Sequence, residues 1–361
     1  MSMLLSPLTI RGADIRNRIW VSPMCQFKCE PGTGMPNQWH LVNAGTYASS
    51  GVGLFMAEAT AVSPDGRITD YCTGIWNEAQ AEEWARVVDF VHSQGAVAGI
   101  QIAHAGRKAS DDLYQKTLPA ERGGWETIGP SPIAVDGMVP PREMTLEDIS
   151  RVIADFGTAA KRAVQAGFKV IEIHAAHGYL LHEFISPLSN QRTDDYGGIL
   201  ENRARFTMEV VREVRASIPD EIALFIRFSA TDWEEGGVTP EETATISQWC
   251  AAEGVDLSDL SSGGLLKAIF IPAPPGYQVP FAEIVKKNAN ILTAAVGKIH
   301  SPQQAEEILQ EEKADAIFLG RELMRNPRFA FQAASELGDT IDYLPDSYRG
   351  IFPPPRKDDH K

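Results

Sequence analysis

Short runs of apolar residues recur along the chain, and each run ends in small or polar residues. The runs are rich in β-branched and aliphatic side chains and cover residues 18–24, 54–60, 97–103, 168–175, 223–230, 255–262, 291–297 and 316–321. Continuous apolar runs of this length are typical of strands that are buried on both faces, as in parallel sheets. The pattern therefore predicts eight buried strands.

Several segments between these runs have the periodicity of amphipathic helices. The clearest lie at 79–95, 146–167 and 202–219, and the apolar side of the first carries Trp84, Val87, Val88 and Val91. A hydroxyl side chain followed by proline is a typical helix start, and it occurs at Thr239-Pro240 and Ser301-Pro302. Glycines in positions that predict helix ends are Gly95, Gly167 and Gly254.

Buried strands that alternate with helices predict a parallel sheet, because each return between parallel strands needs a crossover helix. Eight such repeats favour a closed α/β fold, the (β/α)8 or TIM barrel, formed by residues 1–361 as a single domain. A doubly wound open sheet is the alternative, but no Gly-x-Gly-x-x-Gly fingerprint follows the first strand.

Two regions depart from a plain barrel. Residues 104–145 form a long connection after the third strand, rich in glycine, proline and charge, and this length indicates a functional insertion or lid. Residues 344–361 are too rich in proline and charge to form a helix, and we expect the last of them to be loose.

Composition and charge narrow the classes of partner. The 361-residue chain carries a formal net charge of −15, which opposes binding to the phosphate backbone of nucleic acid. No apolar stretch is long enough to span a bilayer. The four cysteines, which are few and scattered as in proteins of a reducing compartment, are Cys25, Cys29, Cys72 and Cys250. We therefore expect a soluble cytoplasmic protein without a structural metal.

In a barrel of this type the reacting groups lie at the carboxyl ends of the strands. The residues at the predicted ends are Ser22, Pro23, Met24, Cys25, Ala59, Gln101, His174, His177, Tyr179, Arg227, residues 261–264, Gly297, Gly320 and Arg321. A purely structural barrel does not need arginine at the ends of its fifth and eighth strands. The two arginines therefore indicate an anionic ligand, and the last strands carry the usual phosphate site of this fold.

Five motifs at these positions resemble the Old Yellow Enzyme family of FMN-dependent ene-reductases, over essentially the whole chain. They are SPMCQF (22–27), EATAVSPDGR (58–67), QIAHAGRKA (101–109), HAAHGYLLHEFISPLSNQRTDDYGG (174–198) and GRELMRNP (320–327). Cys25 and the ending Tyr348-Arg349-Gly350 are similar to the thermophilic-like, or YqjM-like, branch. The resemblance implies reduction of activated C=C bonds in α,β-unsaturated carbonyl or nitro compounds, with NADPH or NADH as hydride donor, by a ping-pong mechanism.

The resemblance implies that FMN lies across the mouth of the barrel. Its pyrimidine edge would pair with Gln101, whose amide has both donor and acceptor groups. Arg227 would lie beside N1 and O2, where a fixed cation stabilises reduced flavin; taken alone, this arginine is equally consistent with a buried structural ion pair. The remaining cofactor contacts would come from Ser22, Pro23, Met24, Cys25, Ala59, Gly297, Gly320 and Arg321.

The resemblance assigns catalysis to His174, His177 and Tyr179. The two imidazoles would donate hydrogen bonds to the carbonyl or nitro oxygen of the alkene, and Tyr179 would protonate the α-carbon after hydride reaches the β-carbon. Cys25 would contact the substrate and tune the flavin potential, although most free cysteines are simply small buried hydrophobes.

Two positions bear on how closely the chain follows the branch. The branch usually has tyrosine where this chain has Phe27, so one donor to the substrate oxygen is missing. Arg349 matches the position from which the branch inserts an arginine into a neighbouring subunit's site, which implies a homodimer or homotetramer. The chain continues beyond it through Pro353-Pro354-Pro355, and a solvated terminal arginine is the alternative.

Two other functions are compatible with the same residues. The His174/His177 pair, together with Glu172 or His182, could bind the metal of a TIM-barrel hydrolase, but Arg227 at the same mouth opposes a dication. A flavin-binding protein without physiological turnover is the other alternative. No separate dinucleotide motif distinguishes NADPH from NADH.

Overall fold

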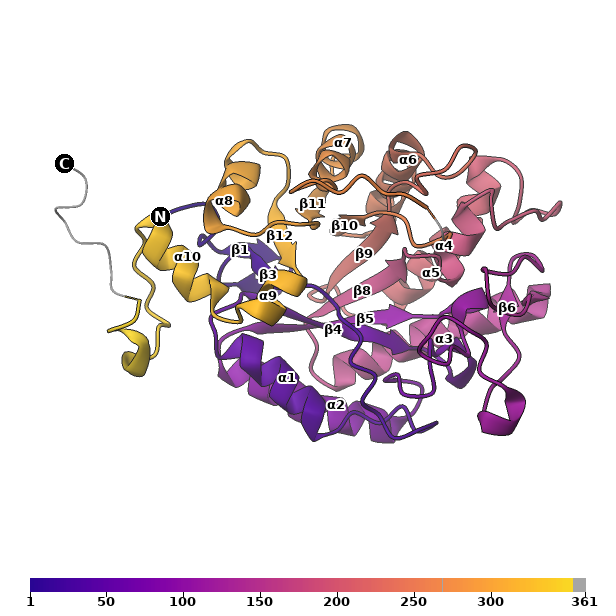
Figure 1. Ribbon diagram of the computed structural model, residues 1–361, viewed down its shortest axis with the longest axis horizontal. Helices are drawn as coiled ribbons and strands as arrows, with labels where there is room; N and C mark the ends of the chain where they lie inside the picture. The colour runs from indigo at the N-terminus through magenta and orange to yellow at the C-terminus, as the bar shows by residue number, and fades with distance from the viewer. Residues whose placement is uncertain (268, 353–361) are drawn as a thin grey trace.

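The chain folds into a closed barrel of parallel strands with helices around it (Figure 1). The computed structural model describes residues 1–267 and 269–352. Within these residues, neighbouring barrel strands follow the order β10-β11-β12-β3-β4-β5-β8-β9. The predicted α/β class and TIM-barrel fold are therefore confirmed.

Each predicted apolar run supplies one barrel strand. The strands are β3 (Ile19–Val21), β4 (Leu54–Ala61), β5 (Val97–Ala103), β8 (Val170–Ala175), β9 (Ala223–Ser229), β10 (Leu257–Ser261), β11 (Leu292–Ala295) and β12 (Ala316–Leu319). The first strand is shorter than the run at 18–24, because Pro23 lacks the N–H that a ladder of hydrogen bonds requires.

The three predicted amphipathic segments are helices with bounds close to those expected. The α-helices are α1 (Gln38–Ala48), α2 (Glu78–Ser93), α3 (Leu146–Gln165), α4 (Leu180–Ile185), α5 (Leu200–Ser217), α6 (Pro240–Ala252), α7 (Val279–Ala289), α8 (Pro302–Gln310), α9 (Arg321–Arg325) and α10 (Phe329–Leu337). Thr239 and Ser301 cap α6 and α8, because each hydroxyl accepts a hydrogen bond from a backbone N–H in the first turn. The predicted start signals are therefore confirmed.

Glycine ends three helices as predicted. Gly95, Gly167 and Gly254 follow α2, α3 and α6 with φ of 74°, 95° and 91°, a left-handed conformation that glycine adopts without a steric penalty.

The periodicity of the sequence did not indicate α1 or the N-terminal hairpin of β1 (Leu8–Ile10) and β2 (Ala13–Ile15). The buried residues of α1 are His40, Ala44, Tyr47 and Ala48. They are too small or too polar to give a clear apolar stripe. The hairpin is too short for its alternation to stand out from the surrounding sequence.

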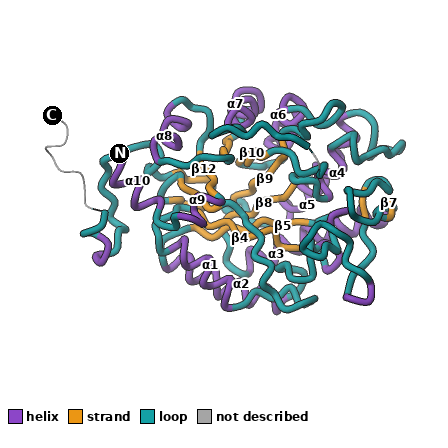
Figure 2. Tube along the Cα trace, in the orientation of Figure 1, coloured by secondary structure: helices purple, strands orange, loops and turns teal. Residues whose placement is uncertain are grey.

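The barrel interior beneath the mouth is filled by apolar side chains. They form one cluster with apolar residues of the N-terminal hairpin, and its larger members include Trp20, Leu54, Met56, Val97, Val170, Phe225, Leu257 and Phe318. A second, larger apolar cluster packs the outer faces of the strands against the helices, and Figure 2 shows the strands at the centre of this arrangement. The barrel is thus a packed core and not a channel.

The connection at 104–145 lies at the end of the molecule opposite the N-terminus (Figure 1). It contains the 3₁₀ turns η2 (Gly106–Lys108) and η3 (Ala120–Arg122) and the short paired strands β6 (Ile128–Gly129) and β7 (Arg142–Glu143). At the other end, the tail begins with the 3₁₀ turn η4 (Asp346–Tyr348). Residues 353–361, for which we expected a loose chain, lie outside the described residues.

None of the helices in the described part of the chain is both long and apolar enough to cross a membrane.

Candidate active site

The ends of β3 and β12 lie side by side at the mouth. The Ser22 N–H donates to the carbonyl oxygen of Leu319 at 3.0 Å, and a Cβ atom at Gly320 would lie 3.6 Å from Met24 Sδ. The Ser22 hydroxyl is buried and has no hydrogen-bond partner among the described residues. A buried hydroxyl of this kind is available to a ligand.

A cavity of about 220 Å³ opens beside this point, after the last two strands. Its lining includes Gly297, Lys298, Gly320 and Arg321. Gly297 has φ of 112°, and a side chain there would place Cβ 2.8 Å from Gln278 Nε2, so the position requires glycine. The cavity brings together Gly297, Gly320 and Arg321, the predicted cofactor contacts after the last two strands, and adds Lys298, which the motifs did not single out.

A polar layer crosses the barrel just above the apolar interior. Gln101 Nε2 donates to Glu172 Oε1 at 2.8 Å, and Arg227 Nε lies 3.1 Å from Asp259 Oδ2. All four side chains are buried. Arg227 therefore does have the structural ion-pair partner that we had considered as an alternative to a ligand contact, and one N–H of Gln101 is engaged within the protein.

Burial changes the protonation of the two carboxyls in this layer. It raises the pKa of Glu172 to about 8, with a contribution from repulsion by Asp259. It also raises the pKa of Asp259, to about 6, against the attraction of Arg227. At neutral pH Glu172 holds a proton, while Asp259 is largely ionised beside Arg227.

The structure brings His174, His177 and Tyr179 together. The centroids of the two imidazole rings are 5.1 Å apart, and the centroid of the Tyr179 ring lies 5.0 Å from that of His174. His174 Nδ1 accepts a hydrogen bond from the Ala176 N–H at 3.3 Å, which places its proton on Nε2. His177 Nε2 lies 2.7 Å from the Ser261 hydroxyl oxygen.

Both imidazoles are neutral at neutral pH. Burial lowers the pKa of His174 and of His177 well below the ordinary value, and the positive charge of Arg227 adds to the shift. Burial raises the pKa of the Tyr179 phenol well above its ordinary value, so the phenol keeps its proton. The group thus has N–H and O–H donors without a net charge.

The loop that carries these residues is fixed by contacts that the sequence did not reveal. His177 adopts a left-handed conformation with φ of 59°. Lys108 Nζ donates to the carbonyl oxygens of His177 and Gly264 at 2.9 Å and 2.8 Å. The Gly178 N–H donates to His182 Nδ1 at 2.9 Å.

His182 is itself held by Asp232, whose Oδ1 lies 3.0 Å from His182 Nε2. This places His182 in the support of the loop and not beside the other two imidazoles. Within the described residues, no group of three or more His, Cys, Asp or Glu side chains is placed to hold a metal ion. The metal-dependent hydrolase alternative is therefore not supported.

Cys25 and Tyr179 pack partly buried against one apolar cluster that includes Ala59 and Cys72. Burial raises the pKa of the Cys25 thiol well above its ordinary value, so the thiol is protonated at neutral pH. Phe27 follows with 36% of its surface exposed and with φ of 53°. Cys25 thus lies against the same cluster as Tyr179, whereas Phe27 is placed only by its position two residues further along the chain.

Arg349 does not lie at this mouth. It follows η4 in the segment after α10 and forms an exposed ion pair with Asp346 at 2.9 Å. It also lines an apolar cavity of about 420 Å³ beside α10, together with Phe331, Leu344 and Phe352.

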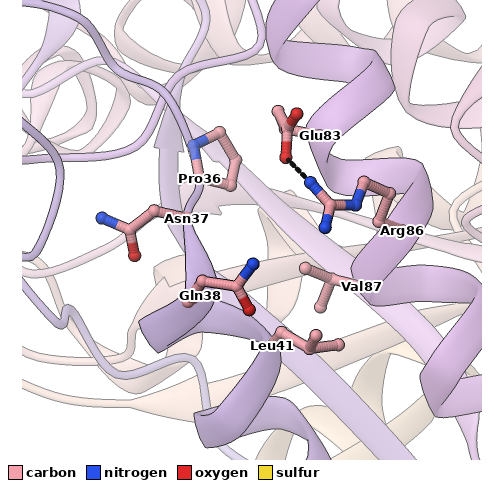
Figure 3. A pocket seen from close by; sticks show the side chains of 7 residues that line it. All are labelled: Pro36, Asn37, Gln38, Leu41, Glu83, Arg86 and Val87. Atoms are coloured by element: carbon pink, nitrogen blue, oxygen red, sulfur yellow. Dashed lines mark hydrogen bonds and ion pairs between the residues drawn. The ribbon is translucent and has the colours of Figure 1, made fainter.

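A separate pocket of about 210 Å³ lies on the outer surface between α1 and α2 (Figure 3). Its polar side chains include Glu83 and Arg86, which form an ion pair with each other at 2.8 Å. None of the predicted site residues lines it, and we assign it no role.

Comparison with known proteins agrees with this arrangement. Residues 3–340 match the model of the NADH:flavin oxidoreductase / NADH oxidase family. An NADPH dehydrogenase from Listeria innocua is 45% identical over 343 residues, which are 95% of this chain and 97% of that protein.

Solved structures give the same result. The old yellow enzyme homologue from Zymomonas mobilis superposes with a TM-score of 0.77 at 26% identity, covering 98% of this chain and 99% of that chain. A 2-naphthoyl-CoA reductase superposes with a TM-score of 0.84 at 26% identity and covers 90% of this chain, but the chain spans only 51% of that protein.

The fold, the mouth and these relatives define an FMN-dependent NAD(P)H oxidoreductase. The chain belongs to the NADH:flavin oxidoreductase / NADH oxidase family, which is the Old Yellow Enzyme family that the motifs predicted.

We expect replacement of Lys108 by methionine to destabilise the protein. Its ammonium group holds two carbonyl oxygens of different loops, and loss of hydrogen bonds to a charged group costs about 1.5–3 kcal/mol. Urea unfolding measures the change. Lys116→Met is the matched control, because Lys116 lies on the same connection with its side chain exposed. Equal stability of the two variants would contradict the role of Lys108.

Proposed function

We propose that this enzyme reduces the activated C=C bond of α,β-unsaturated carbonyl or nitro compounds, with hydride from NAD(P)H, by a ping-pong mechanism. The observation that carries the proposal is the convergence of two neutral imidazoles and a protonated phenol at a mouth that also has a buried guanidinium, that of Arg227. Bound FMN supplies the hydride transfer in both half-reactions.

The donor set fits FMN. The cavity lined by Gly297, Gly320 and Arg321 has room and a cation for the phosphate. Gln101 and Arg227 suit the pyrimidine end, where negative charge collects on reduction. Further contacts to the flavin come from the neighbouring strand ends, through Ser22, Pro23, Met24, Cys25 and Ala59.

His174 and His177 bind and polarise the substrate oxygen. Neutral imidazole N–H groups in a buried site donate strong hydrogen bonds and carry no charge that would bind an anion. The positive charge of Arg227 helps to keep both rings from taking up a second proton. Tyr179 donates the proton to the α-carbon. Its phenol is suited to this role because burial keeps it protonated.

Residues around the site adjust the reduction of the substrate. Cys25 contacts the substrate as a neutral thiol, and Phe27 supplies an apolar edge where the related branch has a phenol. Arg349 completes the site of a neighbouring subunit in a homodimer or homotetramer, a role that its position away from the mouth of its own chain leaves open to it.

Flavin chemistry in two separate half-reactions tests the proposal. We expect FMN-reconstituted protein to be yellow, to bleach with NADPH under anaerobic conditions and to regain its colour with cyclohexenone. Tyr179→Phe should bleach normally but reoxidise at least about 100-fold more slowly with the enone, because general acid catalysis contributes about 10²–10⁴-fold. Protein that stays colourless with excess FMN, or that bleaches but is not reoxidised by any enone or nitroalkene, contradicts the proposal.

Phe27→Tyr should restore a donor at the rim. A single hydrogen bond is worth about 0.5–1.5 kcal/mol, so we expect kcat/KM for a simple enone to rise about two- to tenfold. Phe27→Leu, which removes the ring without adding a hydroxyl, is the control. Unchanged kinetic constants in Phe27→Tyr would show that this position does not reach the substrate.

Subunit mixing tests the assignment of Arg349. Arg349→Ala and Tyr179→Phe subunits, each weakly active alone, should gain activity when they are unfolded and refolded together. In the mixed oligomer an intact Tyr179 site receives Arg349 from its neighbour. A mixture no more active than the sum of its parts, or a protein that is monomeric in sedimentation, contradicts the role.

A further inference from the structure

The polar layer of the barrel contains two acidic groups and one basic group. Gln101, Glu172, Arg227 and Asp259 come from the consecutive strands β5, β8, β9 and β10. Their exposed fractions are 2%, 0%, 5% and 0% respectively. Two carboxyls therefore share one guanidinium in a place where water cannot compensate for the imbalance.

Among the residues that the structure describes, Arg227 is the cation whose charge acts on Glu172, and no second one accompanies it. From β5 it faces the Gln101 amide, from β9 the guanidinium of Arg227 and from β10 the carboxyl of Asp259. His174 follows two residues later on the same strand and is neutral. Below the layer lies the apolar interior, so any proton or ion must arrive from the mouth.

One oxygen of Glu172 is left without a partner. Oε1 accepts a hydrogen bond from Gln101 at 2.8 Å, whereas Oε2 is buried and unpaired within the described residues. An ionised carboxylate with an unpaired buried oxygen is costly, and a protonated carboxyl in the same place costs less because it carries no charge. The geometry thus places a proton on Oε2.

We propose that Glu172 and Asp259 form a proton-holding pair that takes up a proton from solvent when the flavin above them is reduced. The proposal rests on the proposed position of FMN over Gln101 and Arg227. Two electrons and one proton leave reduced FMN with one additional negative charge beside Arg227. Uptake of one further proton by the pair restores the charge balance of the buried layer.

The pH range of this coupling follows from the two carboxyls. Asp259, with a pKa of about 6, can take up a proton on reduction only above about pH 6, and Glu172, with a pKa of about 8, only above about pH 8. A negative charge added nearby raises both pKa values further. In these ranges the reduced enzyme binds more protons than the oxidised enzyme.

Midpoint potentials measured against reference dyes from pH 6 to 10 test the proposal. For the wild-type holoenzyme we expect a slope steeper than that of one proton per electron pair. Glu172→Gln keeps the shape of the side chain and an acceptor for Gln101 but cannot ionise. It should bind FMN normally and lose the additional slope above about pH 8. Asp259→Asn, an independent variant, should lose the additional slope nearer pH 6.

The matched control is Glu183→Gln. Glu183 is also buried, with a pKa raised to about 8 by burial, but it accepts from the Arg107 N–H in the loop region and lies outside the layer. The Glu183→Gln variant should show the same slope of midpoint potential against pH as the wild type.

Stability of the apoprotein gives a readout that does not need FMN. The pKa of Glu172 rises from 4.5 to about 8 on folding. The contribution of this residue to the free energy of unfolding is therefore fully present below about pH 4.5 and is lost as the pH rises through about 8. Glu172→Gln should flatten that decline.

Parallel potential–pH lines for wild type and Glu172→Gln overturn the proposal while the proposed function stands. Failure of the wild type to bind FMN overturns both.

Discussion

The apolar interior of the closed barrel is the constraint on which the site depends. Trp20, Phe225, Phe318 and their neighbours exclude water from below the mouth, so polar groups at the next level must satisfy one another or a ligand. This explains why Gln101 contacts Glu172 and why Arg227 contacts Asp259. The same contacts hold the amide and the guanidinium in fixed positions at the strand ends, which a preorganised site requires.

Burial also sets the chemistry of the groups above this layer. It favours the neutral forms of His174, His177, Tyr179 and Cys25, and Arg227 reinforces the effect on the imidazoles. Neutral donors beside the fixed guanidinium of Arg227 are suited to polarising an uncharged substrate next to a redox cofactor. A metal site would require the opposite, a cluster of anionic or neutral ligands without a nearby cation.

Supporting contacts decide where the donors point. His177 occupies a left-handed turn. Lys108 donates to its carbonyl oxygen, and His182, which is paired with Asp232, accepts from the next N–H, that of Gly178. Gly178 belongs to the same turn, and a Cβ there would lie 2.4 Å from the Gly264 carbonyl oxygen. The geometry of the histidine pair is therefore a property of several loops together and not of its own motif.

The sequence by itself determined the barrel and the strand ends, because buried strands, helix caps and glycine stops are local signals. The family followed from the resemblance of the motifs at those strand ends. It also located the histidine motif, since the residues at strand ends are fixed once the strands are known. It could not show that Glu172 pairs with Gln101, that His182 supports a loop, or that Lys108 bridges two carbonyl oxygens. The contacts of Glu172 with Gln101, of His182 with Asp232 and of Lys108 with Gly264 join residues far apart in the chain. Protonation in turn depends on the burial that only the closed barrel creates.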